Sequence, residues 1–234
     1  MLPFFGGVGA VLMLHSVTAT PRHPAGFNRH LSVTPAFLDA VIAGMKADGY
    51  DFVSMDEAVD RIRAPRRGRR IASITLDDGY RDNLVEALPV FERHGAPFTM
   101  YVAPAMIDGR VDLWWETVEE VVLSRPRLYF NTPDGRVTLD CLTPAKKSEA
   151  IVKLRDYLTI DVPEADQQRV VREIAASAGI DVKALQHNRL LNWDQLRTLA
   201  SHPLATIGAH TVSHANLARL DEDDARREMR EAVR

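Results

Sequence analysis

Short apolar runs alternate along the chain with segments whose apolar residues repeat at helical spacing. Alternation of this kind is typical of βαβ units, in which helices connect neighbouring parallel strands. The expected strands are residues 10–14, 52–54, 71–76, 98–102 and 206–207. The expected helices in this part of the pattern are residues 34–47, 56–62, 82–93 and 114–123. We therefore expect an α/β fold built on a parallel sheet.

The middle of the chain departs from this alternation. Two short apolar runs flank Asn131-Thr132-Pro133-Asp134-Gly135, a sequence that predicts a small hairpin. Two amphipathic helices, residues 144–158 and 164–178, follow with no strand between them. We expect residues 129–187 to form a helical insertion in a single domain that covers residues 1–234. A further helix is expected after Asn192, with Gln195 completing a capping box.

Composition and charge exclude several classes of protein. The chain has 234 residues, of which 46% are hydrophobic, so it has enough apolar mass to bury a core. Its formal net charge of −3 predicts no nucleic-acid and no membrane partner. Six arginines between Arg61 and Arg70 indicate either a solvated loop or an anion or nucleic-acid contact, and they lack the interleaved aromatic residues of a nucleic-acid surface. The single cysteine, Cys141, excludes an intramolecular disulfide.

The apolar N-terminal stretch, residues 1–14, lacks the features of a targeting segment. It has no basic start, no small-residue cleavage site after it, and too few apolar residues to span a bilayer. We therefore expect a cytoplasmic protein.

Two adjacent carboxylates, Asp77 and Asp78, follow the expected strand at residues 71–76. In α/β folds this end of the strands is where ligands bind and reactions occur. Two neighbouring carboxylates repel each other, and this repulsion is costly unless a cation is close. The alternative is an ordinary turn at Asp78-Gly79, with Asp77 capping the next helix.

Two histidines, His210 and His214, stand four residues apart after the expected strand at residues 206–207. At this spacing they share a helix face or converge in a turn, and imidazole nitrogens are common zinc ligands. The alternative is two surface histidines near a helix start. Since this strand ends at the same sheet edge as Asp77 and Asp78, we expect a metal site of two histidines and one carboxylate. Three protein ligands leave a position open for water, as in catalytic zinc sites.

Three aromatic residues are candidate contacts for a substrate. Trp114 and Trp115 could offer a stacking platform for the apolar face of a ligand ring, and the alternative is that they belong to the core. Tyr80 directly follows Asp77-Asp78-Gly79, where it either lines a substrate groove or packs inside the fold.

The motifs Asp77-Asp78-Gly79 and His210-Thr211-Val212-Ser213-His214 resemble those of the polysaccharide deacetylases, carbohydrate esterase family 4, which share the nodulation-type chitooligosaccharide deacetylase homology domain. The phrases Leu14-His15-Ser16-Val17, Asp82-Asn83 and Ala87-Leu88-Pro89-Val90 agree with this resemblance. It covers residues 10–110 and 190–234. The resemblance implies a distorted (β/α)7 barrel and a metal-dependent hydrolase that removes acetyl groups from N-acetylated sugars.

The resemblance also implies a role for each motif residue. Asp77 would be the general base that takes a proton from the attacking water. Asp78, His210 and His214 would hold a divalent metal, with zinc as the first choice and cobalt or nickel as alternatives. His15 would be the general acid that protonates the leaving amine, as in a subset of the family whose acid comes from the first strand.

The sequence departs from the family pattern in two places. Leu14 stands where the family's first-strand phrase usually has tyrosine, and the last one to three strands of the family barrel have no counterpart before Arg234. We therefore expect an incomplete barrel with an exposed edge strand, covered by a homo-oligomer or by another segment. Two other functions stay open: a C–N hydrolase of small cyclic amides or imides, and a non-catalytic carbohydrate-binding remnant.

Overall fold

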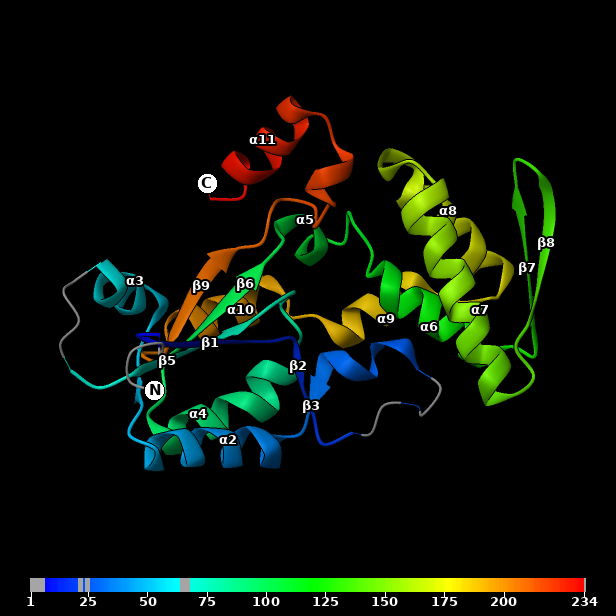
Figure 1. Ribbon diagram of the computed structural model, residues 1–234. Coiled ribbons are helices and arrows are strands. Elements are labelled where there is room, and N and C mark those ends of the chain that lie inside the picture. Colours follow the sequence, from blue (N-terminus) through cyan, green and yellow to red (C-terminus); the bar gives the residue numbers. More distant parts are fainter. Residues whose placement is uncertain (1–6, 21–22, 24–25, 64–67, 234) are drawn as a thin grey trace. The chain divides into compact units, whose positions relative to one another are not determined.

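The computed structural model describes residues 7–20, 23, 26–63 and 68–233 (Figure 1). The chain divides into two compact units. Unit 1 consists of residues 1–20, 31–103 and 190–210, and unit 2 of residues 21–30, 104–189 and 211–234. None of the helices in the described ranges combines the length and the apolar character needed to cross a membrane.

Unit 1 is built on a parallel sheet. Its strands β1 (Gly9–Leu14), β5 (Ile71–Leu76), β6 (Phe98–Val102) and β9 (Ala205–Ala209) lie in the order β1-β5-β6-β9. A two-residue strand, β4 (Asp51–Phe52), pairs with the start of β5. Every residue of β5 is buried, as expected for the apolar central strand of a parallel sheet. The predicted α/β fold with a parallel sheet is confirmed.

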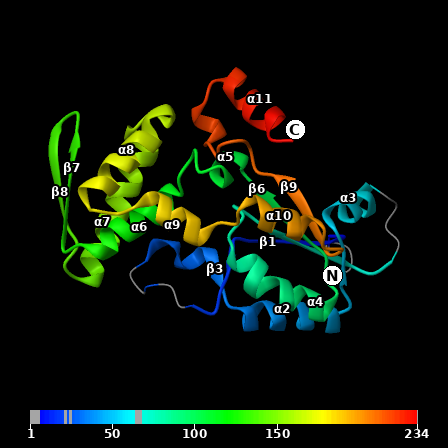
Figure 2. The same ribbon diagram turned by 180° about the vertical axis from the view of Figure 1, so that it is seen from behind.

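The helices of unit 1 are α2 (Pro35–Ala47), α3 (Met55–Arg63), α4 (Leu88–His94) and α10 (Trp193–Ala200). Two of them, α2 and α10, begin at a side-chain cap. The Thr34 hydroxyl accepts a hydrogen bond from the Phe37 N–H at the start of α2, and Asn192 and Gln195 form the predicted capping box of α10. Helices α2 and α4 lie side by side in both views (Figures 1 and 2).

The helix expected over residues 82–93 is divided in two. A π-helical turn, η2 (Asn83–Ala87), precedes α4, and Pro89 occupies the first turn of α4. Proline lacks a backbone N–H and is accommodated best at the start of a helix, which accounts for this boundary. A second, two-stranded sheet that we did not predict pairs β2 (Ser16–Val17) with β3 (Ser32–Val33).

Unit 2 is mostly helical and contains the predicted hairpin, β7 (Arg127–Thr132) and β8 (Gly135–Asp140). Its core joins the hairpin to three helices through buried apolar side chains that include Val121, Phe130, Leu154 and Ile174. The helices that build this core are α6 (Trp114–Ser124), α7 (Pro144–Asp156) and α8 (Glu164–Ser177). The shorter elements are η1 (Phe27–Leu31), α5 (Pro104–Ile107), η3 (Tyr157–Asp161), α9 (Val182–Arg189), η4 (Leu217–Arg219) and α11 (Glu222–Glu231). The last residue of η1, Leu31, belongs to unit 1.

The expected barrel is not seen as a closed sheet within the described residues. There, β1 pairs with β5 alone and β9 with β6 alone, so the sheet is open at both edges. Closure of a barrel requires its first and last strands to pair with each other. Two apolar side chains of the edge strand β1 stay exposed, Val11 by 52% and Met13 by 62%.

The arginine-rich segment is described only in part, because residues 64–67 lie outside the described residues. Within the described part, Arg61 and Arg69 form ion pairs with Asp51, and Arg70 lies over the ring of Tyr50.

Candidate functional site

Asp77 and Asp78 lie in a tight turn at the carboxyl end of β5. The Asp77 N–H donates to the Leu14 carbonyl at 2.9 Å, which continues the β1–β5 ladder by one residue. Asp78 and Gly79 then take positive φ angles of 71° and 76°. Both carboxylates are buried, with Asp77 7% and Asp78 2% exposed. The sequence therefore places two acids at a poorly hydrated sheet edge, where a nearby cation would stabilise their charge.

His210 meets Asp78 at the same edge of unit 1. The His210 N–H donates to the Val102 carbonyl at 2.9 Å, which fixes the residue at the end of β9. Its ring atom Nε2 lies 3.5 Å from Asp78 Oδ1. The predicted convergence of Asp78 and His210 is thus present in unit 1.

The Asp78–His210 separation fits two ligands of one metal ion. Two donor atoms that are each about 2.1 Å from a tetrahedral zinc ion lie roughly 3.4 Å apart, close to the spacing of these two atoms. A carboxylate oxygen and an imidazole nitrogen are also ligand types that zinc and other first-row metals accept.

Backbone strain is concentrated at these motifs. In the described part of the chain, three non-glycine residues have a positive φ: Asp78 at 71°, Thr211 at 59° and His214 at 58°. This conformation costs energy for residues with a side chain, most of all for a β-branched residue such as threonine. The Thr211 hydroxyl accepts a hydrogen bond from the His214 N–H at 3.0 Å. Strained residues of this kind cluster at functional sites, and here they coincide with both motifs.

His15 follows β1 directly, beside the strand end that carries Asp77. Its carbonyl accepts a hydrogen bond from Asn83 Nδ2 at 2.7 Å, and its side chain is half-buried. The neighbouring Ser16 Oγ donates to Asp82 Oδ2 at 2.6 Å, and the Val17 N–H donates to Asp82 Oδ1 at 3.2 Å. Side chains that follow the Asp77-Asp78-Gly79 motif therefore hold the backbone around His15. Its role as general acid stays a prediction.

The same anchoring extends two residues further along the chain. Thr18 Oγ1 donates to Glu86 Oε1 at 2.8 Å, and the Ala19 N–H donates to Glu86 Oε2 at 2.6 Å. We did not predict Asp82 and Glu86 as anchors from the sequence. Their only signal is an acidic pair four residues apart just after the motif, which many surface helices share.

Tyr101, near the carboxyl end of β6, is a further neighbour of the site that we did not predict. Met100 pairs in register with Leu76, so Tyr101 is one residue beyond that pair, as Asp77 is. Burial raises the pKa of the Tyr101 phenol, and the negative charges of Asp77 and Asp56 raise this pKa further. The sequence signal that could have identified Tyr101 was its position near the end of an expected buried strand.

Tyr80 lies inside unit 1 rather than in a groove. Its side chain is fully buried at 0% exposure, and its backbone bridges to Leu190. Of the two interpretations of Tyr80, packing inside the fold is the one that agrees with this burial, and we correct the assignment of Tyr80 to a substrate surface.

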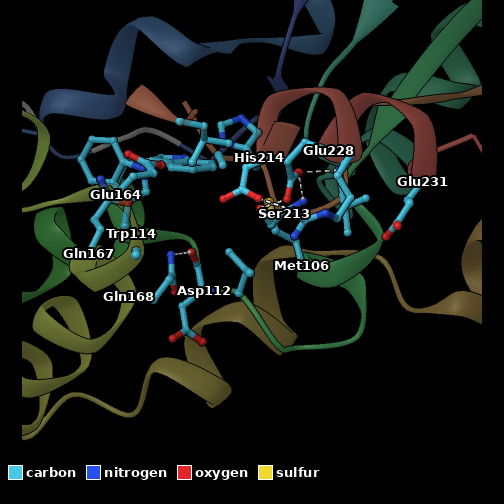
Figure 3. A pocket seen from close by; sticks show the side chains of 18 residues that line it. Met106, Asp112, Trp114, Glu164, Gln167, Gln168, Ser213, His214, Glu228 and Glu231 are labelled. Atoms are coloured by element: carbon cyan, nitrogen blue, oxygen red, sulfur yellow. Dashed lines mark hydrogen bonds and ion pairs between the residues drawn. The ribbon is translucent and has the colours of Figure 1, made fainter. Parts of the chain in front are cut away.

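Trp114 and Trp115 line a cavity of about 250 Å³ within unit 2. Figure 3 shows this cavity, with Trp114, Glu164 and Gln168 on one side and His214 and Ser213 on the other. The Trp115 ring lies 4.9 Å from the His214 ring, centroid to centroid, and is 6% exposed, while Trp114 is half-buried. Of the two rings, Trp114 therefore has the larger exposed fraction available to a ligand.

The wall of this cavity opposite the tryptophans is formed by α11. From it, the Glu228 carboxylate accepts hydrogen bonds from Val212 and Ser213, the residues that precede His214 (Figure 3). Glu228 is another residue of the site that we did not predict. It is one of many charged residues on a polar helix, and nothing in the helix pattern distinguishes it.

Comparison with known proteins identifies the family. The sequence pattern described as polysaccharide deacetylase matches residues 64–234, more than half of the chain. A search of curated proteins gives no match.

Solved structures with a similar fold include deacetylases. The Streptococcus pyogenes deacetylase PplD, in complex with acetate, is 16% identical with a TM-score of 0.50, over 96% of this chain and 65% of that one. A de-N-acetylase from Aggregatibacter actinomycetemcomitans is 15% identical with a TM-score of 0.46, over 89% of this chain and 55% of that one. The chain thus spans between about half and two thirds of the length of these structures. Its match to the family pattern shows that the chain belongs to the polysaccharide deacetylase family.

Proposed function

We propose that this chain is a metal-dependent hydrolase that removes acetyl groups from N-acetylated polysaccharides or oligosaccharides. The observation that carries the proposal is the 3.5 Å separation of Asp78 Oδ1 and His210 Nε2 at the carboxyl edge of the sheet. In this proposal residues 1–234 act as one catalytic domain.

Asp78, His210 and His214 are the proposed metal ligands. His214 is separated from His210 by only three residues of one short loop, and its strained backbone conformation supports a specific role. Zinc is the metal we expect, with cobalt or nickel as substitutes. A divalent ion held there would make a bound water more acidic and polarise the acetyl carbonyl.

Asp77 is the proposed general base. Asp78 would direct its charge to the cation, which leaves the neighbouring Asp77 able to accept a proton from the attacking water. The low exposure of Asp77 limits competing hydration of its carboxylate. A base of ordinary carboxylate strength is sufficient, because the acidified water needs no strong base.

His15 is the proposed general acid. Cleavage of the amide releases an amine, and this leaving group needs a proton. His15 would donate that proton from the end of β1, next to the strand end that carries Asp77. The hydrogen bond from Asn83 to the His15 carbonyl supports a fixed backbone position for this step.

The proposed substrate surface is the cavity lined by Trp114 and Trp115 in unit 2. The Trp114 ring is the more exposed of the two indoles, and an indole ring packs well on the apolar face of a sugar.

Acetate release separates this function from its two alternatives. The chain, loaded with zinc, is incubated in parallel with N-acetylated chitooligosaccharides and with small cyclic imides. Release of acetate from the oligosaccharides alone supports the proposal. Ring opening of the imides alone would assign the chain to the cyclic amide hydrolases. Oligosaccharide binding without either reaction would identify a carbohydrate-binding remnant.

A further inference from the structure

The loop between His210 and His214 is held by one carboxylate from α11. Glu228 Oε2 accepts hydrogen bonds from the Val212 N–H at 2.9 Å and the Ser213 N–H at 2.8 Å. Glu228 Oε1 accepts a third from Ser213 Oγ at 2.7 Å. Both oxygens of this carboxylate are therefore directed at two consecutive loop residues (Figure 3).

The three hydrogen bonds to Glu228 stabilise a loop whose backbone is strained. Thr211 and His214, the residues on either side of Val212 and Ser213, have φ angles of 59° and 58°. Such a backbone persists only when its surroundings fix it. Consecutive N–H groups that point at one anion form a concave arrangement that favours negative charge, and hydrogen bonds to a charged acceptor are stronger than neutral ones.

Neutral contacts fix the other sides of the same loop. The Val212 carbonyl accepts a hydrogen bond from the Ala105 N–H at 2.9 Å. The Trp115 ring packs against His214. Glu228 differs from these contacts because it brings a full charge to Val212 and Ser213, so its removal is a specific way to loosen the loop.

We propose that Glu228 is a positioning residue of the metal centre: it sets the conformation of residues 211–214 and thereby the direction of the His214 ring before metal binds. This inference rests on the proposed function, because it takes His214 as a ligand. Glu228 itself is not a ligand in this scheme, since both of its oxygens are engaged by the loop.

Zinc affinity of the metal-free chain tests the proposal. Calorimetric titration would compare the wild type with Glu228→Ala and Glu228→Gln. Loss of a group that orients a ligand weakens metal binding about 10–100-fold, which is the result expected for Glu228→Ala. Glu228→Gln should lose less, because its amide keeps one acceptor oxygen and its NH₂ group can donate to Ser213 Oγ. The matched control is Glu231→Ala, on the same helix and the same cavity wall, which should bind zinc within twofold of the wild type.

Hydrogen exchange without metal supplies a second readout. The Val212 and Ser213 amides should exchange faster in Glu228→Ala than in the wild type, and Glu231→Ala should leave them protected. Should Glu228→Ala not fold, Glu228→Asp replaces it, since this variant keeps the charge but withdraws the carboxylate by one methylene group.

The outcomes separate the two proposals. A wild type that binds no zinc would overturn the proposed metal centre and this inference with it. A wild type that binds zinc, together with a folded Glu228 variant of unchanged affinity and unchanged amide protection, would overturn this inference alone.

Discussion

Asp77 and Asp78 are neighbours in sequence, yet their backbones differ. The Asp77 N–H still belongs to the β1–β5 ladder, whereas Asp78 has left it for a positive φ of 71°. Asp78 is also the acid whose oxygen lies 3.5 Å from His210. This difference agrees with the proposed role of Asp78 as a ligand and leaves Asp77 for the proposed role of base, the division that the family resemblance implies.

Substitution of Asp77 should separate catalysis from metal binding. Asp77→Asn preserves the size of the side chain but removes the base, so we expect kcat to fall about 10²–10⁴-fold while zinc affinity stays near that of the wild type. His210→Ala should lose both properties. Calorimetry and acetate release on the same protein samples measure the two effects. A fall in kcat of less than tenfold in Asp77→Asn would remove Asp77 from the role of base.

The pKa of Tyr101 reports the charge of Asp77. Burial is the main cause of its raised pKa, and the Asp77 charge adds to it. A negative neighbour disfavours the phenolate, so Asp77→Asn should lower the pKa of Tyr101 without restoring its ordinary value. Tyrosine ring carbon shifts followed by NMR during an alkaline titration measure this change. An identical Tyr101 titration in both proteins would show that the Asp77 charge does not reach the phenol.

Among the elements, η2 and the residue before it form the main anchor of the segment that follows β1. Asp82 and Glu86 together accept four hydrogen bonds from residues 16–19. Asn83 adds a fifth, to the carbonyl of His15. π-Helical turns are often found at functional sites, and this one brings three anchoring side chains to bear on one short segment.

Removal of Asp82 should loosen that segment. Hydrogen bonds to a charged group contribute about 1.5–3 kcal/mol, so Asp82→Ala should lower the free energy of unfolding by about that amount. We also expect kcat to fall, because the backbone of His15 loses a neighbouring anchor. Urea denaturation measures the first effect and acetate release the second.

Asp60→Ala is the control for Asp82→Ala, since Asp60 is an exposed acid on α3. Surface changes of this kind usually stay within about 0.5 kcal/mol. If Asp82→Ala were as stable as this control, Asp82 would not anchor the segment.

The sequence predicted these elements unequally well. The strand at Ile71–Leu76 and the hairpin around Asn131-Thr132-Pro133-Asp134-Gly135 follow from local patterns, and both are present. The β2–β3 pair could not be predicted, because two residues are too few to show a period and their pairing depends on contacts distant in sequence. The anchors Asp82 and Glu228 could not be predicted either, because their partners are also distant in sequence or lie on another element.

At the scale of the whole molecule, the prediction of the candidate site rests on the two sequence motifs and not on the expected barrel. The two motifs alone predict that Asp78 and His210 meet at one sheet edge, and this convergence is present. The barrel came from the family resemblance alone, and the described strands form an open sheet. Tyr80 shows the limit of proximity in sequence, because a residue next to a motif can face the core instead of the site.

The homo-oligomer expected from the sequence stays a prediction, and the open edge at β1 is the feature that supports it. Val11 and Met13 expose apolar surface on this strand, and unpaired strand edges favour association. Light scattering over a range of protein concentrations measures the oligomeric state directly.

Acetate release from N-acetylated chitooligosaccharides, by metal-stripped protein titrated with zinc, tests the central claim most directly. We predict no release without metal, a rise to a plateau at about one ion per chain, and a lasting loss of activity in Asp78→Ala at any zinc concentration. Release at full rate without metal, or a zinc titration curve of Asp78→Ala that matches the wild type, would contradict a metal-dependent deacetylase with Asp78 as a ligand.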